Sequence, residues 1–212
     1  MKVSFYFWFL ILLAAGVEKS AAQNVGKNTI SQRTAQILSG LHVGDADKQL
    51  KVQNVLSAYL DSLESVIATR QDKMRAALQS SDNKELAEAR SQAAWDAAAG
   101  KLNKLHATFL GKLSSHLSRE QIELLKDKMT ENRLKAEYNR FLELLPNLNE
   151  QHKSQIMTYL IEARENAMDA ETADMRAQWF IKYRGRANNY LAAAGYDLRK
   201  ATEVLEQKKT DE

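Results

Sequence analysis

Hydrophobic residues recur every three or four positions through most of the chain, and strict alternation of apolar and polar residues does not persist. Steps of three and four place side chains on one face of an α-helix, whereas a half-buried strand needs alternation. The clearest row follows Asp45 and comprises Val52, Leu56, Tyr59, Leu63, Val66 and Met74. Alanine, leucine, lysine and glutamate, which are good helix formers, dominate the chain. The pattern therefore predicts an all-α fold.

Capping residues set the expected helix boundaries in the first half of the chain. We expect helices over residues 29–39 and 45–78, followed by a loop. Asp82 and Glu85 have the spacing of a capping box, in which each side chain caps the other residue's backbone N–H. A new helix is predicted to start there.

The same capping spacing occurs at Ser118 and Gln121. Pro146 ends the helix that follows, because proline disfavours helical geometry in the residue before it. One helix is therefore predicted over 118–145.

Three further helices are expected in the last third of the chain. Asn149 caps the first, the apolar pattern resumes after Asp169, and Asp197 caps a short tail helix. Gly195 suits the left-handed conformation that often ends a helix. Altogether the sequence predicts a single-domain helical bundle of about five main helices and a short C-terminal helix.

The N-terminus has the pattern of a secretory signal. Lys2 precedes the apolar run Phe5–Ala15, and Ser20, Ala21 and Ala22 place small residues before an expected cleavage site at Gln23. An uncleaved membrane anchor is the alternative, but the run is shorter than the roughly 20 residues that span a bilayer. We expect a cleaved signal peptide over 1–22 and an exported protein, either periplasmic or extracellular.

The mature part is expected to comprise a flexible N-terminus at 23–28, an all-helical domain at 29–207 and a frayed charged tail at 208–212. The chain contains no cysteine, which excludes disulfides, thiol chemistry and a lipid-modified N-terminal cysteine. Loss of two lysines and one glutamate with the signal lowers the net charge from +3 to +2. So small a charge gives no strongly basic face for nucleic acid.

Aromatic residues, arginines and asparagines concentrate between positions 179 and 196. Aromatic rings can cover the C–H face of a sugar, and arginine and asparagine can pair with its hydroxyls or carboxylates. An aromatic stripe at helical spacing is more often part of a buried core, so a core stripe is the favoured interpretation and ligand contact the alternative. Gly185, in the middle of this helix, suggests a close approach of another backbone or a ligand. The candidate ligand-binding residues are Trp179, Tyr183, Arg184, Arg186, Asn189 and Tyr190.

Other polar residues give no catalytic or metal site. Glu162, Glu165 and Asp169 lie on one predicted helix face, where a solvated surface is the favoured interpretation and acid/base chemistry the alternative. The four histidines are scattered, and no glycine-rich phosphate loop is present. No catalytic residue, metal or cofactor is therefore assigned.

Several stretches resemble an exported bacterial family catalogued as a domain of unknown function, number 3826. The most specific read KYRGRANNYL and AGYDL in the C-terminal third. The stretches that carry the resemblance are Leu105–Leu110, Lys126–Thr130, Leu144–Leu148, Glu162–Ala170, Lys182–Leu191 and Ala194–Leu198. The resemblance implies an all-helical, secreted protein, and because members often accompany polysaccharide-degrading systems it also implies a carbohydrate role.

A weaker resemblance is to the periplasmic Spy/CpxP-type helical chaperones, whose helices start with Leu-Thr-x-x-Gln. Leu117, Ser118 and Gln121 nearly reproduce this motif, whereas His152 replaces the glutamine at a second such site.

The leading hypothesis is an exported, non-enzymatic domain that binds carbohydrate or assists polysaccharide-processing proteins. The alternatives are a Spy-like chaperone or scaffold and an uncharacterised carbohydrate-active enzyme. Carbohydrate or polysaccharide-processing proteins are the expected partners, without nucleic acid and without a membrane span after signal cleavage.

Overall fold

The computed structural model describes residues 29–79 and 83–210. The predicted signal peptide and the predicted cap at Asp82 lie outside the described residues. Within the described ranges the chain forms α-helices joined by short loops, without any strand. The all-α prediction is confirmed.

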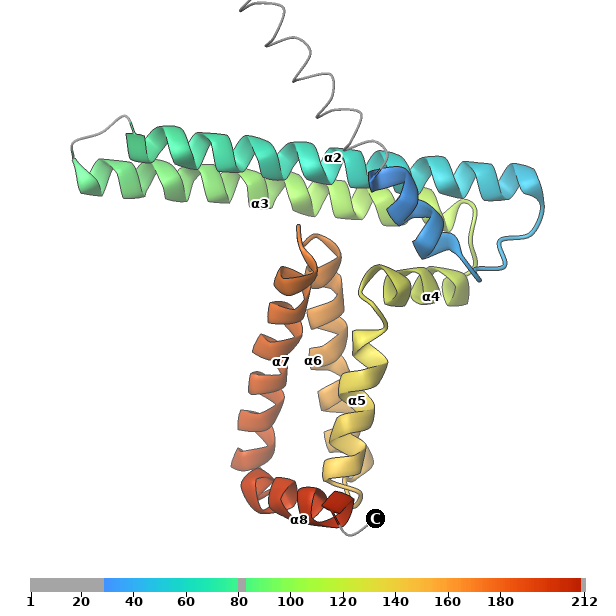
Figure 1. The fold of residues 1–212 in the computed structure, drawn as a ribbon, viewed down its shortest axis with the longest axis vertical. Coiled ribbons are helices and arrows are strands. Elements are labelled where there is room, and N and C mark those ends of the chain that lie inside the picture. The colour runs from blue at the N-terminus through green and yellow to red at the C-terminus, as the bar shows by residue number, and fades with distance from the viewer. Residues whose placement is uncertain (1–28, 80–82, 211–212) are drawn as a thin grey trace, which may run out of the picture.

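Two long antiparallel helices form an arm across one end of the molecule. They are α2 (Ala46–Gln79) and α3 (Lys84–Ser114), which lie side by side along their length. A helix over 29–38 packs beside this hairpin (Figure 1). Asp45 caps α2, since its side chain accepts a hydrogen bond from the backbone N–H of Lys48 at 2.8 Å.

The remaining helices form a stem roughly perpendicular to the arm, so that the molecule has the outline of a T (Figure 1). Helices α5 (Arg133–Leu144), α6 (Glu150–Met168) and α7 (Ala173–Ala193) run along the stem. Helix α8 (Leu198–Thr210) crosses its far end, and α4 (Arg119–Met129) lies where stem and arm meet.

Arm and stem each have a hydrophobic core of their own. The arm core is built from the 29–38 helix, α2, α3 and α4, and one residue of α6, Met168, completes it. The stem core is formed by α5, α6 and α7, with Ile156, Leu160 and Phe180 among its fully buried side chains. The two cores therefore meet at the C-terminal end of α6.

The predicted single helix over 118–145 is wrong, because the chain breaks after Met129 and resumes as α5 at Arg133. Glu131 and Asn132 at the break have left-handed backbone angles, with φ of 53° and 56°. Neither residue is glycine, so this conformation is strained. The carboxylate of Glu131 pairs with Arg176 of α7, which helps to hold the break in place.

Most other predicted helix ends are confirmed. Ser118 and Gln121 form a complete capping box, and the side chain of Asn149 accepts a hydrogen bond at the start of α6. Gly195 follows α7 with φ of 91°, the left-handed angle that its position requires. Helix α3 differs from the prediction, because its cap is Asn83 and lies one residue after Asp82. The side chain of Asn83 accepts a hydrogen bond from the backbone N–H of Leu86 at 3.2 Å.

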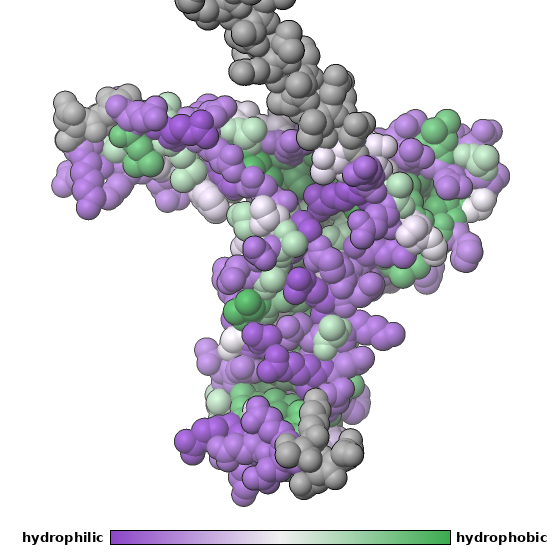
Figure 2. Space-filling view, viewed as in Figure 1, coloured by the Kyte–Doolittle hydropathy of each residue, from purple (hydrophilic) through white to green (hydrophobic). Residues whose placement is uncertain are grey.

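The visible surface is largely hydrophilic. Figure 2 shows polar residues over most of the arm and stem, with hydrophobic patches near both ends of the arm and at the foot of the stem. Across the described ranges, every helix is too short or too polar to be a candidate membrane span.

Candidate functional site

Helices α6 and α7 bring three of the predicted ligand contacts, Trp179, Tyr183 and Arg186 of α7, onto one surface. Together with Tyr159 and Glu162 of α6 they form what is here called the aromatic face. The guanidinium of Arg186 lies 5.0 Å from the ring centroid of Tyr183 and 5.2 Å from that of Tyr159. The same guanidinium donates a hydrogen bond to Glu162 at 3.1 Å. Its charge is therefore held above two rings by a carboxylate.

The members of the aromatic face differ in accessibility. Tyr183 is only 8% exposed and belongs mainly to the stem core. Trp179 is half-buried, with its ring centroid 6.3 Å from that of Tyr183. The side chain of Arg186 is 51% exposed. On the aromatic face, Trp179 and Arg186 are thus the predicted contacts that a ligand could reach most easily.

The other predicted contacts lie around this face or away from it. Tyr190 joins it through an edge contact with Tyr159, and its hydroxyl is 2.8 Å from Nδ1 of His152. Asn189 is exposed on α7. Arg184 instead pairs with Glu137 of α5 at 3.0 Å, which fastens α7 to α5.

The predicted close approach of another backbone at Gly185 is wrong, whereas the close approach of a ligand stays a prediction. A Cβ built on this glycine would have no neighbour within 4 Å. No backbone or side chain in the described residues therefore requires glycine at this position.

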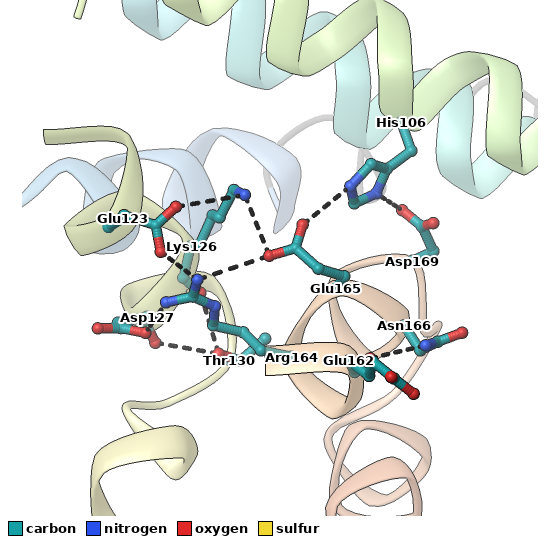
Figure 3. A network of polar contacts seen from close by, with 10 residues as sticks. All are labelled: His106, Glu123, Lys126, Asp127, Thr130, Glu162, Arg164, Glu165, Asn166 and Asp169. Atoms are coloured by element: carbon teal, nitrogen blue, oxygen red, sulfur yellow. Dashed lines mark hydrogen bonds and ion pairs between the residues drawn. The ribbon is translucent and has the colours of Figure 1, made fainter. Parts of the chain in front are cut away.

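A second group of polar side chains joins the arm to the stem, and we call it the ionic joint: Tyr59, His106, Lys126, Glu165 and Asp169. His106 of α3 bridges two carboxylates of the stem, with its Nε2 3.2 Å from Glu165 and its Nδ1 3.1 Å from Asp169 (Figure 3). Lys126 of α4 donates to Glu165 at 3.0 Å, and the Tyr59 hydroxyl of α2 donates to Asp169. Four helices and the residue after α6 thus meet in one network.

The network continues through Arg164, which is 3% exposed (Figure 3). Its guanidinium donates to Asp127 at 2.6 Å and also to Glu123. Both carboxylates belong to α4, so this arginine anchors the C-terminal part of α6 to α4.

The contacts of the ionic joint shift the pKa values of its members. Hydrogen bonds to Asp169 and Glu165 outweigh burial and raise the pKa of His106 to about 9. Burial opposes ionisation of Glu165, but hydrogen bonds from His106 and Lys126 outweigh it and lower the pKa of Glu165 to about 2. Burial, reinforced by the charge of Asp169, raises the pKa of the Tyr59 hydroxyl. At neutral pH His106 is therefore a cation between two carboxylates.

This arrangement stabilises an interface better than it serves proton transfer. A protonated His106 uses both ring N–H groups on carboxylates, so neither nitrogen has a free lone pair. Within the described ranges, no group of three or more histidine and acidic side chains is placed to hold a metal ion.

The favoured interpretation of Glu165 and Asp169 as part of a solvated surface is wrong. Both are partly buried in the ionic joint, whereas Glu162 is exposed and pairs with Arg186. The sequence reasoning also missed His106 and Lys126. The i, i+4 spacing of Glu165 and Asp169 was the available signal, since it can place two carboxylates against one cation.

A family model described as "Protein of unknown function (DUF3826)" matches residues 27–210. Comparison with curated proteins gives no match. The family model covers most of the chain, and the chain therefore belongs to the family of proteins of unknown function DUF3826.

Proposed function

We propose that this protein is an exported, non-enzymatic helical domain that binds carbohydrate on the aromatic face, alone or beside polysaccharide-processing proteins. One observation carries the proposal: the half-buried ring of Trp179 and the exposed Arg186–Glu162 pair share one surface, since Trp179 and Arg186 both lie beside the ring of Tyr183. An apolar surface and paired polar groups within one patch are what a sugar ring requires.

The chemistry of each group supports this role. The indole of Trp179 offers a flat surface for the C–H face of a pyranose, and Lys182 lies 4.8 Å from its ring centroid. Arg186 can donate hydrogen bonds to sugar oxygens, while Glu162 can accept them from hydroxyls. Because Glu162 already holds Arg186, part of the entropy cost of positioning that side chain is met before a ligand binds.

The N-terminal sequence supports export, and the family resemblance supports a carbohydrate role. The apolar run at Phe5–Ala15 is typical of a signal peptide. The family that the chain resembles often accompanies polysaccharide-degrading systems, which favours a glycan ligand over a protein client.

Thermal unfolding of the purified protein against a panel of polysaccharide fragments tests the proposal. A ligand at one hundred times its dissociation constant adds about 2.7 kcal/mol to the free energy of unfolding. For a chain of this size we expect Tm to rise by about 5–10 °C. Trp179→Ala should abolish the rise.

Trp95→Ala is the matched control. Trp95 is 45% exposed on α3 and also carries a cation above its ring, with Arg70 4.5 Å away, but it lies on the arm. The proposal predicts that this variant keeps the full ligand-induced rise in Tm. Loss of the rise in both variants, or its retention in Trp179→Ala, would contradict binding at the aromatic face.

The alternatives predict different results in the same samples. If no glycan raises Tm and the protein suppresses aggregation of an unfolded client, the chaperone or scaffold hypothesis replaces ours. If incubation shortens a polysaccharide, measured as new reducing ends or unsaturated products, the non-enzymatic part of the proposal is wrong.

A further inference from the structure

A cavity of about 360 Å³ lies between the 29–38 helix, the middle of α2 and the α6–α7 connection. This volume is at the lower end of the range of about 300–1,000 Å³ that small-molecule sites occupy. The cavity is on the arm side of the ionic joint and shares no residue with the aromatic face. It is therefore a separate candidate site.

The lining of the cavity is divided between apolar and polar side chains. Leu60, Leu63 and Ile67 of α2 are buried and give an apolar surface. Glu64 of α2 and Glu171 of the α6–α7 connection are exposed and contribute carboxylates. Such a surface can take both the C–H groups and the hydroxyl groups of a small molecule.

Arg33 lines the same cavity as a half-buried side chain, and no carboxylate of the described residues forms an ion pair with its guanidinium. Its Nη2 atom is shielded from solvent and has no hydrogen-bond partner, so a ligand in the cavity would meet the other atoms of the guanidinium. Burial and the nearby charge of Arg176 both lower the pKa of Arg33, against the opposing charge of Glu131. Arg176 already pairs with Glu131 at 2.6 Å. Glu131 is therefore held by Arg176, and neither Glu64 nor Glu171 of the lining forms an ion pair with Arg33.

The two carboxylates of the lining restrict what could compensate this charge. Glu171 accepts two hydrogen bonds from Gln71, at 2.9 and 3.0 Å, and so stays beside Gln71. A compact, highly charged anion such as phosphate would be repelled by Glu64 and Glu171. A molecule with one carboxylate and several hydroxyls avoids this conflict, because its hydroxyls can donate to the carboxylates of the lining.

We propose that the cavity binds a sugar-sized, hydroxylated carboxylic acid, represented by a hexuronic acid. Arg33 pairs with the carboxylate of the ligand, Glu64 and Glu171 accept from its hydroxyls, and the leucines contact its C–H face. The site is separate from the aromatic face and does not depend on glycan binding at that face.

Ligand-observed NMR titration of the full chain with sodium D-glucuronate tests the proposal, with D-glucose and sodium acetate as reference ligands. Glucose lacks the carboxylate and acetate lacks the hydroxyls. We expect both to bind at least about tenfold more weakly than glucuronate, since each loses one set of contacts. No binding of glucuronate, or equal binding of glucose or acetate, would overturn the proposal.

Two variants locate the site. Arg33→Gln removes the charge and should weaken glucuronate binding about tenfold or more. Ala68→Phe should fill the cavity from an exposed position of α2 and have the same effect. Arg199→Gln, on the exposed side of α8, is the matched control and should bind as the wild type does.

Each outcome is decisive. Unchanged binding in Arg33→Gln overturns the proposal, even if Ala68→Phe does not fold. Repeating the titration with Trp179→Ala separates this site from the aromatic face, because that variant leaves the cavity intact. Loss of glucuronate binding in Trp179→Ala alone would assign the ligand to the aromatic face instead.

Discussion

Alkaline pH should destabilise this protein through loss of the proton on His106. In the folded protein its pKa is about 9, compared with 6.5 for an unperturbed histidine. A pKa that is raised by folding gives a stability contribution that is complete below about pH 6.5 and is lost as the pH rises through 9. Deprotonation leaves two carboxylates of the ionic joint sharing a neutral ring.

The difference between the two pKa values sets the size of the effect. At about 1.4 kcal/mol per pKa unit, the difference corresponds to about 3.5 kcal/mol. The side chain of His106 is 16% exposed, and Glu165 keeps its contact with Lys126 after His106 loses its proton. We therefore expect a loss of about 2–3 kcal/mol between pH 6.5 and 9.5, or about 4–12 °C in Tm.

Urea denaturation across this pH range measures the loss directly. His106→Gln keeps a hydrogen-bond donor but cannot change its charge, so its free energy of unfolding should vary little over the same interval. His42→Gln is the matched control, since this histidine is exposed, and it should follow the wild type. A wild-type curve that is flat between pH 6.5 and 9.5, or an equal slope in His106→Gln, would refute the reasoning.

Three further predictions concern stability. Arg164→Met should lower the free energy of unfolding in urea by about 2–3 kcal/mol, because it leaves two partly exposed carboxylates of α4 without their buried partner; an effect below 1 kcal/mol would argue against this anchor. The pKa of Glu165 is lowered to about 2, so its contribution to the free energy of unfolding is present above about pH 4.5 and is lost as the pH falls through 2. In Glu165→Gln the free energy of unfolding should therefore fall less steeply between pH 4.5 and 2 than in the wild type. Gly185→Ala should raise Tm by about 1–4 °C, because alanine favours the helix and its Cβ meets no neighbour. Gly195→Ala should instead lower Tm, because the φ of Gly195 is 91°, which alanine rarely adopts. Equal changes in Tm for the two variants would contradict these backbone roles.

The sequence predicted the helix ends that depend on local chemistry. Ser118 with Gln121, Asn149 and Gly195 act on backbone groups within a few residues of themselves, so their spacing contains the necessary information. The break between α4 and α5 is different. No proline or glycine marks it, and the pairing of Glu131 with Arg176 joins residues 45 positions apart.

The ionic joint could not be predicted from spacing for the same reason. Tyr59 and Asp169 are separated by 110 residues, and His106 and Asp169 by 63. The sequence places Glu165 and Asp169 on one helix face, but whether that face meets solvent or cations depends on how the arm lies on the stem. On the aromatic face, Trp179, Tyr183 and Arg186 were grouped correctly by their helical spacing, whereas their partners Tyr159 and Glu162 came from α6.

The position of the ionic joint along the arm makes the hairpin a lever. Tyr59 contacts the stem, Gln71 contacts Glu171 of the α6–α7 connection, and α2 continues for eight residues beyond Gln71 to Gln79. At 1.5 Å per residue its tip extends roughly 12 Å beyond the contact of Gln71. A rotation of about 10° about that contact would therefore move the tip by about 2 Å. Loss of one proton from His106 acts on the joint between arm and stem. The displacement of the hairpin that follows would be largest at its far end.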